Sequence, residues 1–353
     1  MVPVLNREGK VLFPCKERRA RCLMAKGKAK PYWQKGIFCI KLIVEESVKD
    51  REYPDVALGI DPGSKREGYT VATEKQVVLN ITTNTPSWIK DKIETRRNLR
   101  RSRRQRNTPY RKCRSNKNSK QARLPPSTKA RWNAKLRIIS LLMRILPITL
   151  VNVEDISAKT KKGISGWNRS FSPLEVGKKY FYKTIEKVYP QVDLILTKGF
   201  ETSSRRKARG LEKSKSKLDY TWEAHNVDSH ILCEMSFGQT TSIPEHKGIY
   251  KVEFIEFSRR QLHVQNFAKG GIRKQYGGTV SLGISRGSIV RYKERLVYIG
   301  GTSKGRLSIH SVITGKRLSQ NIKIGDIEVL YNNKRRVQFL PRLKSWVSLH
   351  IFS

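Results

Sequence analysis

The chain has 353 residues, with 73 Lys and Arg against 29 Asp and Glu, and its formal net charge is +44. This length accommodates two or three domains, and 37% hydrophobic residues suffice for a packed core. So large a positive charge favours nucleic acid as the partner over a membrane surface, because no stretch approaches about 18 uninterrupted apolar residues and no signal-peptide core is present. We therefore expect a cytoplasmic protein with no membrane partner.

The five cysteines are scattered, and none forms a C-x-x-C pair, so neither a disulfide framework nor a zinc ribbon is predicted. All six histidines lie at or after His225. A site that needs a histidine therefore cannot be built from residues 1–224 alone.

Residues 1–54 predict a small N-terminal module. Val2 and Val4, and then Val11 and Phe13, alternate around the turn at 6–9, which is the pattern of a β-hairpin. A short basic helix follows Pro14, and residues 37–46 predict a further strand.

Residues 55–92 predict an antiparallel meander whose first strand, Val56 to Ile60, is buried on both faces. The turn Pro62-Gly63 ends that strand, so Asp61 lies at an edge of the sheet. The two other strands are expected at 68–72 and 76–81.

Residues 93–126 form an arginine-rich segment with a predicted helix at 94–106. Between Thr95 and Val153 there are 18 Lys or Arg and no Asp or Glu. A helix with this much positive charge repels itself, so it needs phosphates as partners. The candidate phosphate ligands are Arg96, Arg97, Arg100, Arg101, Arg103, Arg104, Arg106, Arg111 and Arg114.

The remaining segments alternate between helix and strand before ending in β structure. Residues 127–200 predict helix, strand, helix and strand, with Glu154 at the end of the first of these strands. Residues 201–242 predict a basic loop, in which Arg205 and Arg206 are candidate nucleic-acid ligands, followed by a helix over 220–237. Residues 243–353 predict a separate β-rich domain of short strands. The fold class is thus α/β with a mixed sheet.

Three acids occupy informative places: Asp61 and Glu154 end two strands, and Asp228 lies in the last predicted helix. If the two strands are neighbours, their ends place both carboxylates at one edge, and a helix across that edge brings the third. Clustered carboxylates need cations, and two Mg²⁺ ions about 3.5 to 4 Å apart, or Mn²⁺ in their place, would satisfy them and hydrolyse a phosphodiester.

His225 precedes Asp228 by three residues, so on one helix both side chains share a side, and His225 could orient or deprotonate the attacking water. Taken alone, an Asp before Pro-Gly is also typical of a turn, a Glu after a strand is typical of an exposed position, and a His-x-x-Asp pair on a helix is typical of a surface hydrogen bond. A non-catalytic RNA-binding protein and a junction resolvase that works without RNA therefore stay open as alternatives.

The order Ile60-Asp61-Pro62-Gly63, then Val153-Glu154, then His225-Asn226-Val227-Asp228 resembles the split RuvC motifs of RNA-guided nucleases, which have an RNase H-like fold. The N-terminal module resembles that of the IscB and IsrB families, although its Pro-Leu-Met-Pro motif reads Val-Leu-Phe-Pro here. The arginine-rich segment is similar to their bridge helix. The 70 residues between Glu154 and His225 contain no histidine for an HNH nuclease, so the resemblance is to IsrB.

This resemblance implies a prokaryotic nickase that acts as a monomer within a ribonucleoprotein and associates with the nucleoid during activity. It would carry a structured guide RNA (ωRNA), bind duplex DNA beside a target-adjacent motif, and cut the displaced strand with Asp61, Glu154 and Asp228 as metal ligands. The C-terminal domain would contact the RNA or the DNA motif. Its candidate ligands are Arg273, Lys274, Arg335 and Arg336.

Overall fold

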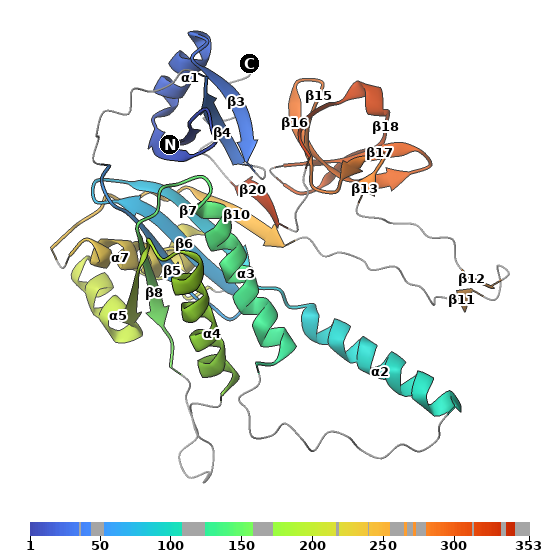
Figure 1. Ribbon diagram of the computed structural model, residues 1–353, viewed down its shortest axis with the longest axis horizontal. Helices are drawn as coiled ribbons and strands as arrows, with labels where there is room; N and C mark the ends of the chain where they lie inside the picture. The colour runs from blue at the N-terminus through green and yellow to red at the C-terminus, as the bar shows by residue number, and fades with distance from the viewer. Residues whose placement is uncertain are drawn as a thin grey trace.

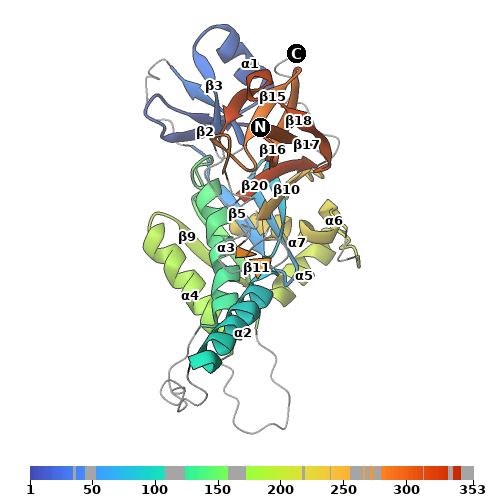
Figure 2. The same cartoon turned by 90° about the vertical axis from the view of Figure 1, so that its right-hand side faces the viewer.

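The computed structural model contains a seven-stranded central sheet, a four-stranded N-terminal sheet and a five-stranded C-terminal sheet (Figure 1, Figure 2). Helices and mixed sheets together confirm the predicted α/β class. The residues that the structure describes are 1–34, 37–43, 53–107, 124–157, 172–216, 219–238, 240–254, 265–266, 271–272, 280–312, 314–332 and 337–342. Within these ranges, no helix combines the length and the apolar content needed to cross a membrane.

The N-terminal sheet has the strand order β2-β1-β4-β3 and packs against one short helix. The predicted hairpin is confirmed: its turn is closed by Asn6, whose side-chain oxygen accepts the backbone N–H groups of Glu8 and Lys10 at 3.0 and 2.7 Å. The strand at 29–34 was not predicted, because Lys30 and Pro31 interrupt its apolar pattern. The elements are β1 (Val2–Leu5), β2 (Val11–Cys15), α1 (Glu17–Ala25), β3 (Ala29–Gln34) and β4 (Ile37–Leu42).

The central sheet has the strand order β20-β10-β7-β6-β5-β8-β9. The predicted meander is confirmed, since β5, β6 and β7 pair antiparallel, and β8 and β9 then run parallel to β5. The first strand is buried from Val56 to Ile60, as expected of a strand covered on both faces. The bounds are β5 (Val56–Asp61), β6 (Arg66–Thr73), β7 (Val77–Asn84), β8 (Leu150–Asp155) and β9 (Asp193–Lys198).

Different helices cover the two faces of this sheet. Leu58 packs in one core cluster with residues of α3 (Pro126–Leu142) and α4 (Pro173–Val188), whereas Ala57 clusters with Cys233 of α7 (Val227–Ser236). Figure 2 shows α3 and α4 on one side of β5, with α5 (Gly199–Ala208), α6 (Trp222–His225) and α7 on the other. Because side chains alternate along a strand, Asp61 belongs to the same face as Ala57, which α7 covers.

Two helical predictions need correction. Residues 203–208, predicted as basic loop, belong to α5, whose start is fixed by Glu201 accepting the backbone N–H of Lys198 at 2.7 Å. The helix predicted over 220–237 is interrupted at Asn226, which separates α6 from α7. The predicted arginine-rich helix is present as α2 (Ile89–Asn107), which extends away from the sheet in Figure 1.

The strands after residue 248 divide between two sheets. β10 (Ile249–Phe254) pairs with β7 and with β20 (Val337–Arg342), so both extend the central sheet although they lie within the predicted β-rich domain. Five other strands form a separate sheet with its own core, in the order β18-β17-β16-β15-β19. Their bounds are β15 (Ile289–Tyr292), β16 (Arg295–Ser303), β17 (Arg306–Ser311), β18 (Arg317–Ile322) and β19 (Glu328–Tyr331). Two-stranded pairs form from β11 (Gln265–Asn266) with β12 (Gly271–Ile272), and from β13 (Val280–Ser281) with β14 (Ile284–Ser285).

Candidate active site

Asp61 and Glu154 lie side by side at one end of the central sheet. β5 and β8 are parallel neighbours in which Ile60 pairs with Val153, so the next residues of both strands meet at the same edge. Glu154 shares its face with Asn152, whose side-chain amide donates to the Leu232 carbonyl of α7 at 3.0 Å. Both carboxylates therefore lie on the face that α7 covers.

Asp228 reaches this edge from the first turn of α7, where it is almost fully buried. Asn226, just before the helix, donates to the carbonyls of Tyr69 and Ile81 at 3.1 and 3.0 Å and accepts a hydrogen bond from Thr82 at 2.7 Å. The side chain of one buried asparagine thus ties the start of the helix to β6 and β7.

Two glycines let the end of α6 and the start of α7 lie directly on the strands. A Cβ atom at Gly59 would overlap the Ser229 carbonyl, and one at Gly68 would overlap the His225 carbonyl. Only glycine permits this close approach of helix and sheet backbones. The position of Asp228 relative to Asp61 is therefore set by backbone contact.

In the structure, the positive charges of Lys213 and Arg206 neutralise the carboxylates of Asp61 and Asp228. The Lys213 ammonium donates to Asp61 Oδ2 at 3.2 Å and to Asp228 Oδ2, while Arg206 donates to Asp228 Oδ1. Burial lowers the pKa of Lys213, but the two carboxylates raise it more, so the pKa lies above its ordinary value. Lys213 was not predicted as a site residue, because one lysine among many in a basic segment carries no local signal.

The surroundings of Glu154 strongly oppose its ionisation. Burial, followed by the neighbouring carboxylates of Asp61 and Asp228, raises its pKa to about 8, and it shares a hydrogen bond with Asp61. Its side chain also lies against the start of α5, where a Cβ atom at Gly199 would come within 2.7 Å of Glu154 Oε1. A strongly raised pKa caused by adjacent carboxylates is typical of a functional site.

His225 lies nearby, at the end of α6, but not on a continuous helix with Asp228. Asn226 separates the two helices, so the argument that a three-residue spacing places both side chains on one side does not hold. Burial, and then the positive charge of Arg66, lower the pKa of His225 below its ordinary value. Its Nε2 atom is buried without a hydrogen-bond partner, so a neutral imidazole nitrogen is available near the carboxylates.

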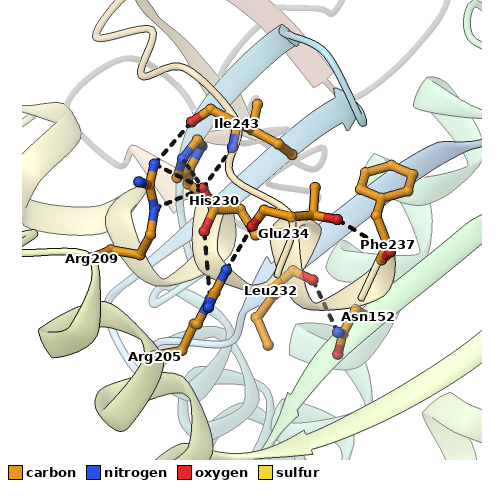
Figure 3. A network of polar contacts seen from close by, with 9 residues as sticks. Asn152, Arg205, Arg209, His230, Leu232, Glu234, Phe237 and Ile243 are labelled. Carbon is orange, nitrogen blue, oxygen red and sulfur yellow. Dashed lines mark hydrogen bonds and ion pairs between the residues drawn. The ribbon is translucent and has the colours of Figure 1, made fainter. Parts of the chain in front are cut away.

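Arg205 and Arg206 have partners inside the protein rather than free guanidinium groups. Arg206 pairs with Asp228, and Arg205 donates to the Thr241 carbonyl at 2.6 Å and lies 3.8 Å from Glu234. Figure 3 shows Glu234 of α7 between Arg205 and Arg209 of the neighbouring segment, with His230 and Ile243 beside it. The prediction that these two arginines bind nucleic acid assumed an exposed loop, whereas they attach α5 to α7.

Glu234 is the centre of this buried network. Its Oε1 accepts the backbone N–H of Ile243 at 2.9 Å and the Arg209 guanidinium at 3.2 Å, and His230 Nε2 is 3.4 Å away. Burial raises its pKa, but these hydrogen bonds and charges outweigh burial, and the pKa lies below its ordinary value.

The other predicted nucleic-acid ligands divide by position. Four arginines of α2 are exposed to solvent: Arg96, Arg97, Arg100 and Arg101. Arg103, Arg104 and Arg106 belong to the same helix, but their side chains lie outside the described part. The residues wholly outside the described ranges are Arg111, Arg114, Arg273, Lys274, Arg335 and Arg336.

The donor set fits a hard divalent cation, since three carboxylates supply only oxygen ligands. Within the described ranges, no group of three or more Asp, Glu, His or Cys side chains already stands in a metal-holding arrangement. Lys213 and Arg206 instead supply the positive charge. Asp61, Glu154 and Asp228 are the residues that would hold a metal ion in place of Lys213.

Comparison with known proteins adds a family resemblance for the N-terminal half. A family model described as RRXRR protein matches residues 2–169, just under half of the chain, and this span includes Asp61 and Glu154. T. thermophilus RuvC in complex with a Holliday junction substrate is similar at 13% sequence identity and a TM-score of 0.28, covering 51% of this chain and 90% of that chain. No curated protein matches.

Proposed function

We propose that the protein is an RNA-guided, metal-dependent DNA nuclease of the IsrB type that nicks the displaced strand of its target. The observation that carries this proposal is the convergence of Asp61, Glu154 and Asp228 at one sheet edge from segments far apart in the chain. A purely structural protein has no need for three adjacent carboxylates, because each raises the free energy required to ionise the others.

The topology around the carboxylates supports a nuclease core. Three antiparallel strands followed by two parallel ones, β7-β6-β5-β8-β9, form the arrangement that the RNase H-like resemblance implies. The acids occupy the end of the first strand, the end of the fourth and a helix across the edge.

Asp61, Glu154 and Asp228 would hold divalent ions such as Mg²⁺, which would activate a water and stabilise the leaving oxygen of a phosphodiester. Asp61 and Asp228 already hold a cation between them, the Lys213 ammonium. His225, whose Nε2 is buried without a hydrogen-bond partner and whose pKa is lowered, would be the base that takes a proton from the attacking water.

The charge distribution supports nucleic acid as substrate and guide. The net charge of +44 exceeds what the protein can neutralise internally, and α2 presents a solvent-exposed row of arginines. Backbone contacts to an RNA and to an RNA–DNA heteroduplex need this kind of surface rather than base-specific readout.

The test is nicking of supercoiled plasmid by the ribonucleoprotein in Mg²⁺, with Asp61→Ala, Glu154→Ala and Asp228→Ala compared with wild type. Each variant should retain RNA binding and lose nicking. The matched control is Asp193→Ala, an exposed acid at the opposite end of β9, which should nick at the wild-type rate.

Undiminished nicking by Asp61→Ala would refute the assignment of Asp61 as a metal-binding catalytic residue. Cleavage that proceeds equally well without RNA would favour a guide-independent resolvase. Tight RNA binding with no cleavage of matched target by wild type would favour a non-catalytic RNA-binding protein.

A further inference from the structure

A pocket of about 370 Å³ adjoins the carboxylate edge and has no role in the mechanism above. Glu154 belongs both to the pocket wall and to the carboxylate cluster, and the turn that follows Asp61 forms another part of the wall. The remaining wall comes from α3 and α4, which cover the sheet face opposite α7. A molecule in this pocket therefore contacts Glu154, the one member of the carboxylate cluster that also lines the pocket.

The wall combines aromatic and apolar surface with hydroxyl groups. Tyr182 supplies a half-buried aromatic ring, and the nearly buried Trp132, whose ring already packs on Phe181 and under the Lys135 ammonium, contributes only part of its surface. Pro62 and Leu174 supply apolar surface, and Thr128 adds a hydroxyl. A ligand that matches this lining has flat apolar faces and polar edges, as a nucleobase does, because every base presents a π-face for stacking and hydrogen-bonding groups at its rim.

The wall is held rigidly before any ligand arrives. Lys178 of α4 donates to the Ile156 carbonyl at 2.9 Å and pairs with Asp155 at 2.7 Å, and Tyr182 donates to Asp155 at 2.9 Å. Trp132 lies against Phe181, with ring centroids 5.0 Å apart. These contacts fix α4 to the end of β8, so a ligand does not have to order the site.

The charged side chains around the pocket favour a ligand in which the base carries a phosphate. The ammonium groups of Lys135 and Lys178 are already paired with carboxylates, Glu67 in one case and Asp155 in the other. Arg131, by contrast, is exposed at the pocket and has no carboxylate partner among the described residues. One free guanidinium beside an apolar pocket suits a phosphate attached to the bound base.

We propose that this pocket binds the nucleoside adjacent to the scissile phosphate, with Arg131 on the neighbouring phosphate. This rests on the proposed nuclease function and deepens it, because the pocket positions the strand so that the next phosphodiester reaches the carboxylates. Proximity of this kind accelerates a reaction by converting a bimolecular encounter into a positioned one.

The direct test is photocrosslinking, which does not require cleavage. The ribonucleoprotein, in EDTA, receives matched duplex whose displaced strand carries 5-iodouracil at one position at a time. Crosslinks should peak at one position, flanking the site cut in Mg²⁺, and should map to peptides that contain Trp132 or Tyr182. Crosslinks that map elsewhere, or show no preferred position, would overturn the proposal whether or not the protein cuts.

The second test pairs a change in the DNA with a change in the protein. An abasic residue at the crosslinked position should lower wild-type nicking about tenfold, since one base stacked on an aromatic wall contributes on the order of tenfold or more in binding. Thr128→Trp, at a half-buried position in the first turn of α3, should fill the pocket and make nicking insensitive to the abasic residue.

Arg131→Ala should reduce crosslinking severalfold, whereas Arg144→Ala, an exposed arginine just after α3, should not. If wild type nicks normally but the abasic residue has no effect at any position, the pocket inference fails while the nuclease function stands. If wild type nicks nothing yet crosslinks at Trp132 or Tyr182, the pocket stands and the nuclease function fails.

Discussion

The raised pKa of Glu154 predicts that the metal-free protein loses stability as the pH rises. The folded state keeps a proton on Glu154 up to about pH 8, whereas the ordinary value for the group is 4.5. Between these values the folded protein binds more protons than the unfolded chain, so the free energy of unfolding falls with increasing pH. Its contribution is fully present below pH 4.5 and lost by the time the pH passes about 8.

The size of the expected loss in unfolding free energy depends on the pH range over which it is measured. Each pH unit below the folded pKa corresponds to about 1.36 kcal/mol, so raising the pH from 6 to 9 removes at most about 2.7 kcal/mol. Solvent on the open side of the carboxyl screens part of this, and we expect a loss of about 2 kcal/mol. Glu154→Gln cannot ionise and should lack this loss, becoming more stable than wild type at pH 9.

The assay is urea unfolding of wild type and Glu154→Gln in EDTA at pH 6, 7.5 and 9. The difference between the two proteins is the quantity that matters, because it cancels other titrating groups such as His225. Equal slopes of stability against pH in both proteins would refute the argument that Asp61, Asp228 and burial act on Glu154. Mg²⁺ should stabilise wild type at pH 9 far more than the variant, because a bound ion favours the ionised carboxylate.

Three further predictions concern the surroundings of the carboxylates. Gly199→Ala places a Cβ atom within 2.7 Å of Glu154 Oε1 and should lower the nicking rate about tenfold, whereas Gly301→Ala, with open space around it, should leave the rate unchanged. Lys213→Met should lower the thermal midpoint in EDTA yet reduce the Mg²⁺ concentration needed to restore it, because no ammonium competes with the ion; an unchanged Mg²⁺ requirement would contradict this reading. Glu234→Gln should reduce the free energy of unfolding by about 2 kcal/mol in urea titrations, because it leaves the charges of the half-buried Arg205 and Arg209 uncompensated, and a change below about 1 kcal/mol would show that the network contributes little.

The strands and the meeting of the acids could be predicted because their signals are local. β5 is a continuous apolar run, β8 is apolar apart from Asn152, and each ends in acidic residues, so parallel pairing is enough to bring Asp61 and Glu154 together. Asp228 was expected to join them only on the condition that its helix packs across the same edge, as α7 does.

The parts that could not be predicted depend on partners distant in sequence. α5 looks like a basic loop, because its arginines become compatible with a packed helix only when Glu234 and Asp228 neutralise them. The break at Asn226 has no local signal either, since asparagine also occurs within helices, and here its side chain binds the backbone of two strands. Lys213 could not be predicted either, because its role depends on contacts with Asp61 and Asp228 that form only in the folded protein.

The pairing of β10 with β20 brings Phe254 opposite Val337, so the polypeptide leaves and re-enters the central sheet at adjacent points. The sequence between these two residues, which includes the five-stranded sheet, can therefore be lengthened, shortened or exchanged without altering the spacing of the strands that hold the acids. Other modules can therefore be grafted at this junction without moving the strand ends that carry Asp61 and Glu154.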